Sequence, residues 1–197
     1  MPILMIMDIE GATAEQYDGV DELLGGLTPE NAPAGLISHA AAVTDTGFIV
    51  ADVWESAEDL QRFFDEKLGA AIAGAGLPRA EPRIVPVHNH IEGSGEEGAV
   101  LVLVELDGMT TDDYDALTSD MEAHAGDGSA HPSVAHVIGV SDDGLVAVDI
   151  WESGQAFAEF GETELAPRMG ADQMARMQPR VSELHNHVRV KAPTTAG

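Results

Sequence analysis

Apolar and polar positions follow a pattern along this chain that occurs twice. Residues 3–9 and 100–106 are apolar runs of strand length, and each is followed by a glycine and a threonine that can cap a helix. In the first copy, Thr13 and Gln16 form a candidate capping box before a segment whose apolar residues recur at helical spacing. Residues 35–43 and 47–54 then flank the sequence Thr-Asp-Thr-Gly, which predicts a short β-hairpin.

The remainder of each copy predicts a second helix and a closing strand. Ser56 and Asp59 form another candidate capping box, and the helix that follows has one apolar stripe. The members of this stripe are Leu60, Phe63, Phe64, Leu68 and Ile72. Residues 84–91 form the closing strand. The predicted order is therefore β-α-β-β-α-β, the ferredoxin-like arrangement of the α+β class.

The whole pattern recurs at a fixed offset of 97 residues. Residues 3–91 align without a gap with residues 100–188, and 21 of the 89 aligned positions are identical. Units of this length suit small domains better than solenoid repeats. We therefore expect a fused duplication with the following parts: repeat 1 at 1–91, a linker at 92–98 (EGSGEEG), repeat 2 at 99–190, and a disordered tail at 191–197.

Composition and charge limit the partners of the protein. The 197 residues include 35 acidic and 9 basic side chains, for a formal net charge of −26. Such a surface repels nucleic acid and anionic membranes, so we expect neither as a partner. The absence of cysteine excludes thiolate metal sites and cysteine nucleophiles. With no secretory signal and no apolar run of about 20 residues, a cytoplasmic protein is expected, and the acidity is interpreted as solubility in a salty or crowded cytoplasm.

Two motifs resemble a known superfamily. The strands that end in VADVWES (50–56) and VAVDIWES (146–153) run directly into a helix with an inward phenylalanine, and each last strand carries a His-Asn pair. This combination resembles the dimeric α+β barrel superfamily, and within it the antibiotic-biosynthesis-monooxygenase-like proteins. The resemblance implies two sheets packed face to face as a barrel. The two repeats would supply both sheets as an intrachain pseudo-dimer, and further homo-oligomerisation is left open.

Strand parity predicts which side chains point into such a barrel. In the third strand, Asp52 and Trp54 share one face, and the purely aliphatic opposite face is expected to lie under the helices. Asp52 and Trp54, and equally Asp149 and Trp151, are therefore expected in the barrel interior.

The same parity places further acids in that interior. In the first strand, Leu4, Ile6 and Asp8 are expected to point inward, with Glu105 as the counterpart of Asp8. The interior has no evident Lys or Arg to offset these acids, so an apolar ligand that is uncharged or cationic is expected.

The sequence His-Asn-His occurs in both closing strands, at residues 88–90 and 185–187. Alternation places the two histidines on one face and the asparagine on the other. In the superfamily, the fourth strand of one unit pairs with the second strand of the other. The resemblance thus implies that His39 lies near His185 and His187, and that His136 lies near His88 and His90.

Two interpretations of these clusters stay open. In the first, an imidazole that titrates near neutrality acts as a general base on a bound substrate. The catalytic candidates are His39, His136, His88, His185, Asp52 and Asp149, and the substrate-binding candidates are Trp54, Trp151, Asn89 and Asn186. In the second, neutral imidazoles bind a divalent metal. The metal candidates are His90 and His187, together with the other four histidines.

The resemblance implies a cofactor-independent oxygenase, or a related oxidoreductase, that acts on a small apolar, aromatic-type substrate and binds no cofactor tightly. Haem-degrading members use an axial histidine on the second helix, and this chain has no histidine between His39 and His88 or between His136 and His185. The alternative is a non-catalytic protein that binds a ligand or metal at the two repeat seams. A ligand-sized cavity would favour the enzyme.

Overall fold

The computed structural model describes residues 1–93, 95, 97–124 and 131–190. These residues form two units, which are described separately. Unit 1 comprises residues 1–86 and 183–190, and unit 2 comprises residues 87–182. The predicted tail at 191–197 and two positions of the predicted linker, 94 and 96, lie outside the described residues.

Unit 1 contains an antiparallel sheet with the strand order β4-β1-β3-β2-β8. Its strands are β1 (Ile3–Glu10), β2 (Leu36–Thr44) and β3 (Gly47–Trp54), with the start of β4 (Arg83–Glu92) and the end of β8 (Arg180–Arg189). The hairpin between β2 and β3 forms where the sequence predicts it.

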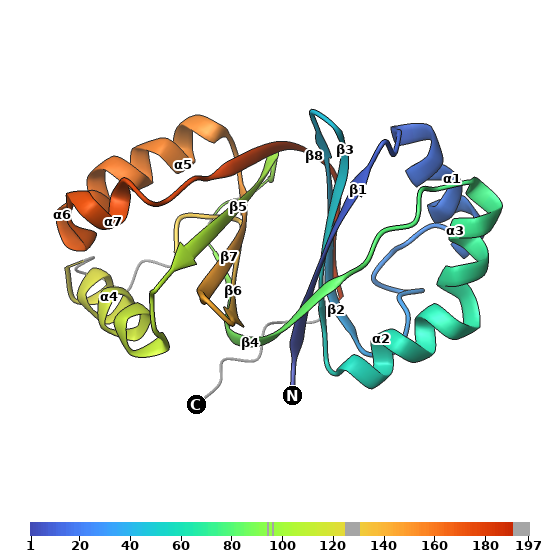
Figure 1. Ribbon diagram of the computed structural model, residues 1–197, viewed down its shortest axis with the longest axis horizontal. Coiled ribbons are helices and arrows are strands. Elements are labelled where there is room, and N and C mark those ends of the chain that lie inside the picture. The colour runs from blue at the N-terminus through green and yellow to red at the C-terminus, as the bar shows by residue number, and fades with distance from the viewer. Residues whose placement is uncertain (94, 96, 125–130, 191–197) are drawn as a thin grey trace. The chain divides into compact units, whose positions relative to one another are not determined.

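The helices of unit 1 cover one face of this sheet (Figure 1). They are α1 (Ala14–Leu24), α2 (Ala57–Phe63), the π-helical turn η1 (Phe64–Leu68) and α3 (Gly69–Ala75). The predicted capping box of Thr13 and Gln16 is present at the start of α1. Ser56 caps α2 by accepting a hydrogen bond from the backbone N–H of Asp59. The expected β-α-β-β-α-β order is therefore confirmed here.

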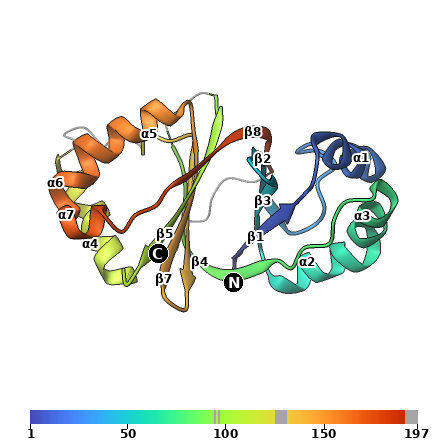
Figure 2. The same ribbon diagram turned by 45° about the horizontal axis from the view of Figure 1, so that its top comes forward.

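Unit 2 contains a sheet with the strand order β8-β5-β7-β6-β4, and its helices again lie on one face (Figure 2). Its strands are β5 (Val100–Asp107), β6 (Ala135–Ser141) and β7 (Gly144–Trp151), with the end of β4 and the start of β8. Its helical segments are α4 (Thr111–His124), α5 (Gly154–Phe160), the π-helical turn η2 (Gly161–Leu165), α6 (Ala166–Met169) and α7 (Ala171–Met174).

The expected exchange of closing strands is confirmed. In unit 1, the strand next to β2 is β8, which is near the end of the chain. In unit 2, the strand next to β6 is β4. Each unit thus has the ferredoxin-like α+β arrangement with the closing strand of the other half of the chain at one edge. The fused duplication and the face-to-face packing of the two sheets stay predictions.

The expected orientation of β3 is wrong. Trp54 belongs to the core under the helices, where its ring lies 5.5 Å from that of Phe63, and Asp52 points to the same side. The aliphatic residues of β3 pair with Leu4 and Ile6 of β1, on the face away from the helices. Alternation groups residues by face, but it does not determine which face the helices cover. Leu4 and Ile6 of β1 lie on the face away from the helices, and their place in a barrel interior stays a prediction.

The same correction applies to unit 2. Trp151 packs against Phe157 and Phe160 of α5, and Asp149 faces the same helical layer. The side chains of Asp52, Trp54, Asp149 and Trp151 therefore lie between the sheet and the helices of their own unit.

Within the described residues, no helix combines the length and the apolar character needed to span a bilayer.

Candidate functional site

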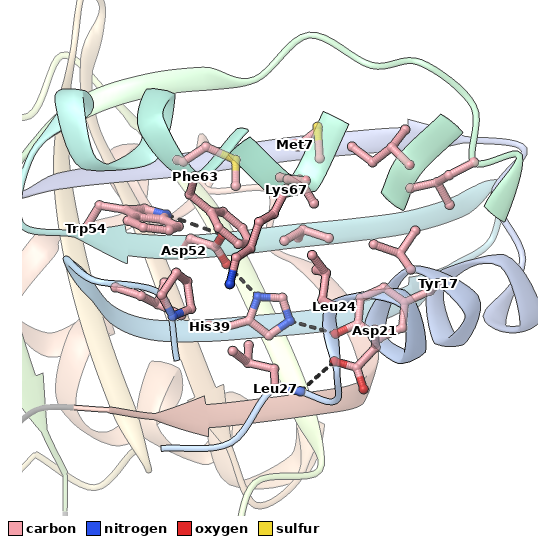
Figure 3. A pocket seen from close by; sticks show the side chains of 18 of the residues that line it. Met7, Tyr17, Asp21, Leu24, Leu27, His39, Asp52, Trp54, Phe63 and Lys67 are labelled. Carbon is pink, nitrogen blue, oxygen red and sulfur yellow. Dashed lines mark hydrogen bonds and ion pairs between the residues drawn. The ribbon is translucent and has the colours of Figure 1, made fainter. Parts of the chain in front are cut away.

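A cavity of about 100 Å³ lies between the sheet and the helices of unit 1 (Figure 3). A buried water requires about 10–15 Å³ by the same measure, so the space suits a small organic molecule. Most of its wall is aliphatic or aromatic. The ionisable side chains that line it are Tyr17, Asp21, His39, Asp52 and Lys67.

Three of these side chains form one buried hydrogen-bonded chain. His39 and Asp52 face each other on neighbouring strands, and Nδ1 of His39 lies 2.7 Å from Oδ1 of Asp52. Nε2 of His39 lies 2.6 Å from Oη of Tyr17, which comes from α1. His39 and Asp52 are only 9% and 7% exposed, so little water competes for these contacts.

The partners of His39 determine where the protons lie. A carboxylate can only accept, so Nδ1–H of neutral His39 donates to Asp52 and Nε2 accepts from the Tyr17 hydroxyl. Burial raises the pKa of Tyr17, which keeps the phenol protonated. Nε2 is the basic nitrogen of His39 in this arrangement, and the Tyr17 hydroxyl is hydrogen-bonded to it. A proton from a bound molecule would therefore reach Nε2 through the Tyr17 hydroxyl.

Two further side chains hold this chain in place. Nδ2 of Asn186 donates to Oη of Tyr17 at 3.1 Å, and Nε1 of Trp54 donates to Oδ2 of Asp52 at 3.4 Å. The binding candidates Asn186 and Trp54 thus contact the candidate catalytic residues directly. Both hydrogen bonds restrict the rotation of the side chains that flank His39.

A β-bulge explains why His185 and Asn186 reach the same side of β8. Ala41 pairs with Asn186 and Ala42 pairs with Leu184, so His185 is the extra residue. A bulge breaks the alternation of side chains and can redirect one of them. Nε2 of His185 pairs with Asp18 of α1 at 2.7 Å, and its ring lies edge-on to Tyr17. The expected placement of asparagine opposite the first histidine is therefore wrong.

Unit 2 contains the same arrangement at an offset of 97 residues. Nδ1 of His136 is hydrogen-bonded to Asp149, and Nε2 of His136 lies 2.9 Å from Oη of Tyr114. Asn89 donates to Tyr114 at 3.0 Å. His88 is the bulge residue of β4, and its Nε2 lies 2.7 Å from Oδ1 of Asp115.

The surroundings of the second arrangement differ. His131 stacks on His136 with ring centroids 4.5 Å apart and lines a smaller cavity of about 50 Å³. Burial, with a contribution from His136, lowers the pKa of His131 to about 4. Nε1 of Trp151 is buried without a hydrogen-bond partner among the described residues, whereas Trp54 has Asp52.

In the predicted histidine cluster of unit 1, His39 and His185 both contact Tyr17. Both ring nitrogens of His39 are engaged by Tyr17 and Asp52, and Tyr17 also contacts His185. His90 is buried, and burial together with His136 lowers its pKa to about 4. In the described part of the chain, no group of three or more His, Asp or Glu side chains is arranged to hold a metal ion. Metal binding by His90 and His187 stays a prediction.

Sequence reasoning missed several residues of these sites. The tyrosines and the acids that follow them, Tyr17-Asp18 and Tyr114-Asp115, are identical at the 97-residue offset, so this alignment carried a signal for them. Lys67, which lines the same cavity as Asp52 and comes from η1, was not among the predicted site residues. His131 has no counterpart in the first copy, where the aligned residue is Ala34.

Comparison with known proteins shows similarity of fold. No family model matches the chain, and no curated protein matches it. A proposed monooxygenase from Fusobacterium nucleatum has 7% identity and a TM-score of 0.67 over 95% of this chain and 94% of its own. A second, from Lactobacillus acidophilus, has 12% identity and a TM-score of 0.62 over 98% of both chains.

A mutant chlorite dismutase from Candidatus Nitrospira defluvii is also similar. It has 10% identity and a TM-score of 0.57, and the match covers 94% of this chain and 92% of the dismutase. At such identities the likeness concerns the fold alone. The chain therefore has the ferredoxin-like α+β fold of these proposed monooxygenases and of chlorite dismutase.

Proposed function

We propose that the protein is an oxygenase-like enzyme that binds a small apolar molecule of the aromatic type in the unit 1 cavity and removes a proton from it, without a tightly bound cofactor. The observation that carries this proposal is the buried Asp52–His39–Tyr17 chain in the wall of an otherwise apolar cavity. The likeness of fold to two proposed monooxygenases supports the reaction class.

His39 is the general base of the proposed reaction. The substrate proton moves to Oη of Tyr17 while the phenol proton moves to Nε2 of His39. The raised pKa of Tyr17 disfavours a free phenolate, so the two transfers are coupled. Asp52 then stabilises the imidazolium ion through the hydrogen bond at Nδ1.

The deprotonated carbon reacts with dioxygen, which is the oxidant. For an activated CH₂ group, a C–H bond breaks, a C–O bond to dioxygen forms, and loss of water leaves a C=O group. One oxygen atom stays on the substrate and the other leaves as water, so the substrate itself supplies all the electrons. The apolar wall excludes water that would otherwise protonate the carbanion.

Unit 1 is the proposed reaction site because its cavity has about twice the volume of that in unit 2. In unit 2, His131 lies directly against His136 and occupies part of the corresponding space. Asp149 is hydrogen-bonded to His136 as Asp52 is to His39. A substitution at Asp149 is therefore a matched control for one at Asp52.

The probe for this proposal is 2-indanone, a small aromatic ketone with acidic CH₂ protons. We expect the protein to accelerate exchange of these protons for deuterium, measured by NMR in D₂O, and to consume oxygen with the same compound. Asp52→Asn should lower the catalysed exchange rate by about 100-fold or more, because the base loses its charged partner.

The matched variant Asp149→Asn should keep most of the exchange activity, and circular dichroism should show that both variants are folded. Equal rates for the wild type and a folded Asp52→Asn variant would contradict the proposal. So would the absence of any exchange above the buffer rate, or equal losses in the two variants.

A further inference from the structure

Lys67 contributes the one ammonium group among the cavity-lining residues of unit 1. It lies in the π-helical turn η1, on the same side of the helical segment as Phe63 and Ile72. Figure 3 shows its side chain running from the helix into the cavity, with the nitrogen directed toward the His39–Asp52 pair. The aliphatic part of a lysine can follow an apolar wall while its charge faces a ligand.

The two carboxylates that line the cavity with Lys67 accept hydrogen bonds from other donors. Asp52 accepts from His39 and Trp54, and Asp21 accepts from the backbone N–H of Leu27 at 2.8 Å. Among the described residues, Lys67 has no hydrogen bond or ion pair. Lys67 is solvent-exposed at the edge of this apolar cavity, so its positive charge faces water when no ligand is bound and can pair with a bound molecule.

Unit 2 has the opposite charge at the aligned position. Glu164 stands 97 residues after Lys67, and it pairs with Arg168 at 2.9 Å. Glu164 does not line the smaller cavity, whose ionisable side chains are Tyr114, His131, His136 and Asp149. The two cavities share the Asp–His–Tyr chain and differ in the cation. A ligand preference found only in unit 1 can therefore be assigned to Lys67, because the Asp–His–Tyr hydrogen bonds are present in both units.

We propose that Lys67 determines the specificity of the unit 1 cavity by binding the anionic oxygen of a small aromatic ligand of the phenolate or enolate type. The ammonium group pairs with the oxygen while the aliphatic wall contacts the ring. The proposal rests on the proposed function for the location of the site and extends it to the charge of the ligand. A ligand that ionises in the cavity gives its proton to the His39 chain and keeps its negative charge beside Lys67.

Binding of 4-nitrophenol to the intact chain tests this inference, because its neutral and ionised forms absorb at different wavelengths. Nitrobenzene is the probe without an ionisable oxygen. We expect Lys67→Met to weaken binding of the phenolate about tenfold and to leave binding of nitrobenzene unchanged. In the wild type, the bound phenol should ionise at a lower pH than the free phenol, and this shift should be lost in Lys67→Met.

Two variants control for charge and folding. Lys67→Arg should retain the preference for phenolate, since it keeps the cation. Arg79→Met removes one exposed positive charge outside the cavity and should leave both affinities unchanged. Equal phenolate binding by the wild type and Lys67→Met would overturn the inference, and so would the absence of binding of both probes.

The outcome is separable from that of the proposed reaction. Lys67-dependent binding of phenolate without proton exchange or oxygen consumption would support the binding site and contradict the enzyme. Exchange that depends on Asp52, with phenolate binding that is insensitive to Lys67, would support the enzyme and contradict the role of Lys67.

Discussion

At the scale of single residues, the two Asp–His–Tyr chains differ in the neighbours of the histidine. His39 borders an open cavity, whereas His136 has His131 stacked on its ring and lies near enough to His90 to influence its pKa. Two close imidazoles are not stable when both are charged. Burial, with a smaller contribution from His136, lowers the pKa of His90 and of His131 to about 4, so unit 2 holds both in their neutral forms.

This neutrality predicts an acid-sensitive unit 2. Well above pH 6.5 both histidines are neutral in the folded and unfolded states, so their protonation does not affect stability there. As the pH falls from about 6.5 to about 4, the unfolded chain takes up protons that the folded unit does not. The free energy of unfolding should then decrease by up to about 3 kcal/mol for each histidine. Urea unfolding at several pH values measures this slope.

Removal of one histidine should make the slope shallower. His131→Asn is expected to lose part of the decrease between pH 6.5 and pH 4, even if its stability at pH 7 also changes. The exposed His124 provides the control, because His124→Gln should leave the slope as in the wild type. An identical slope in His131→Asn and the wild type would contradict the prediction.

At the scale of secondary structure elements, irregular segments bring the functional side chains together. Each bulge directs a histidine and the following asparagine toward the same helix. His185 and Asn186 contact α1, and His88 and Asn89 contact α4. The π-helical turn η1 has a comparable effect. Phe64, expected in the apolar stripe, is 46% exposed, and Lys67 takes a place facing the cavity. Such turns insert a residue into a helix and occur often at functional sites.

The hairpin of β2 and β3 depends on close contact at Gly47. This residue pairs with Glu10, and a Cβ added there would clash with the backbone carbonyl oxygen of Ile9. Backbone atoms cannot move aside as a flexible side chain can. We therefore expect Gly47→Ala to lower the free energy of unfolding by about 3 kcal/mol, measured by urea unfolding.

Gly161 is the control for this substitution. It has a helical φ of −57°, and a Cβ added there would meet no atom within 4 Å beyond its chain neighbours and the backbone of its own helix. Gly161→Ala should keep the stability of the wild type or raise it by up to about 1 kcal/mol, because alanine restricts the unfolded chain. Similar losses in the two variants would show that close backbone contact is not the cause.

At the scale of the whole molecule, the dominant property is the negative charge of −26. The few cations are used locally, as where Arg168 pairs with both Asp120 and Glu164. Because 35 acidic side chains stand against 9 basic ones, repulsion between acids outweighs attraction between opposite charges. Such self-repulsion opposes the folded state and is reduced by dissolved salt.

Stability should therefore increase with ionic strength. We expect the melting temperature to rise by several degrees between 0.05 and 1 M NaCl, since about 1 kcal/mol corresponds to about 2–4 °C for a chain of this size. Differential scanning calorimetry measures the change, and KCl should act like NaCl if screening is the cause. A melting temperature that is constant or falls with either salt would contradict the expectation.

Much of the local structure could be predicted from the sequence by itself. The alternation of apolar positions and the caps at Thr13 and Ser56 determined the order of strands and helices, because these signals act between neighbours in the chain. Asp52 was a candidate site residue because it is a carboxylate between apolar strand residues, and the gapless offset of 97 residues matched it with Asp149. The resemblance to a superfamily added the exchange of closing strands.

Only the tertiary structure decided how these residues meet. Alternation could not show that the helices cover the Asp52 face of β3, because that depends on which face packs against segments distant in sequence. The bulge at His185 reverses the parity on which the histidine prediction relied. Tyr17 and Lys67 join the site from two helices through side-chain packing, and no pattern within either helix indicates a partner on another element.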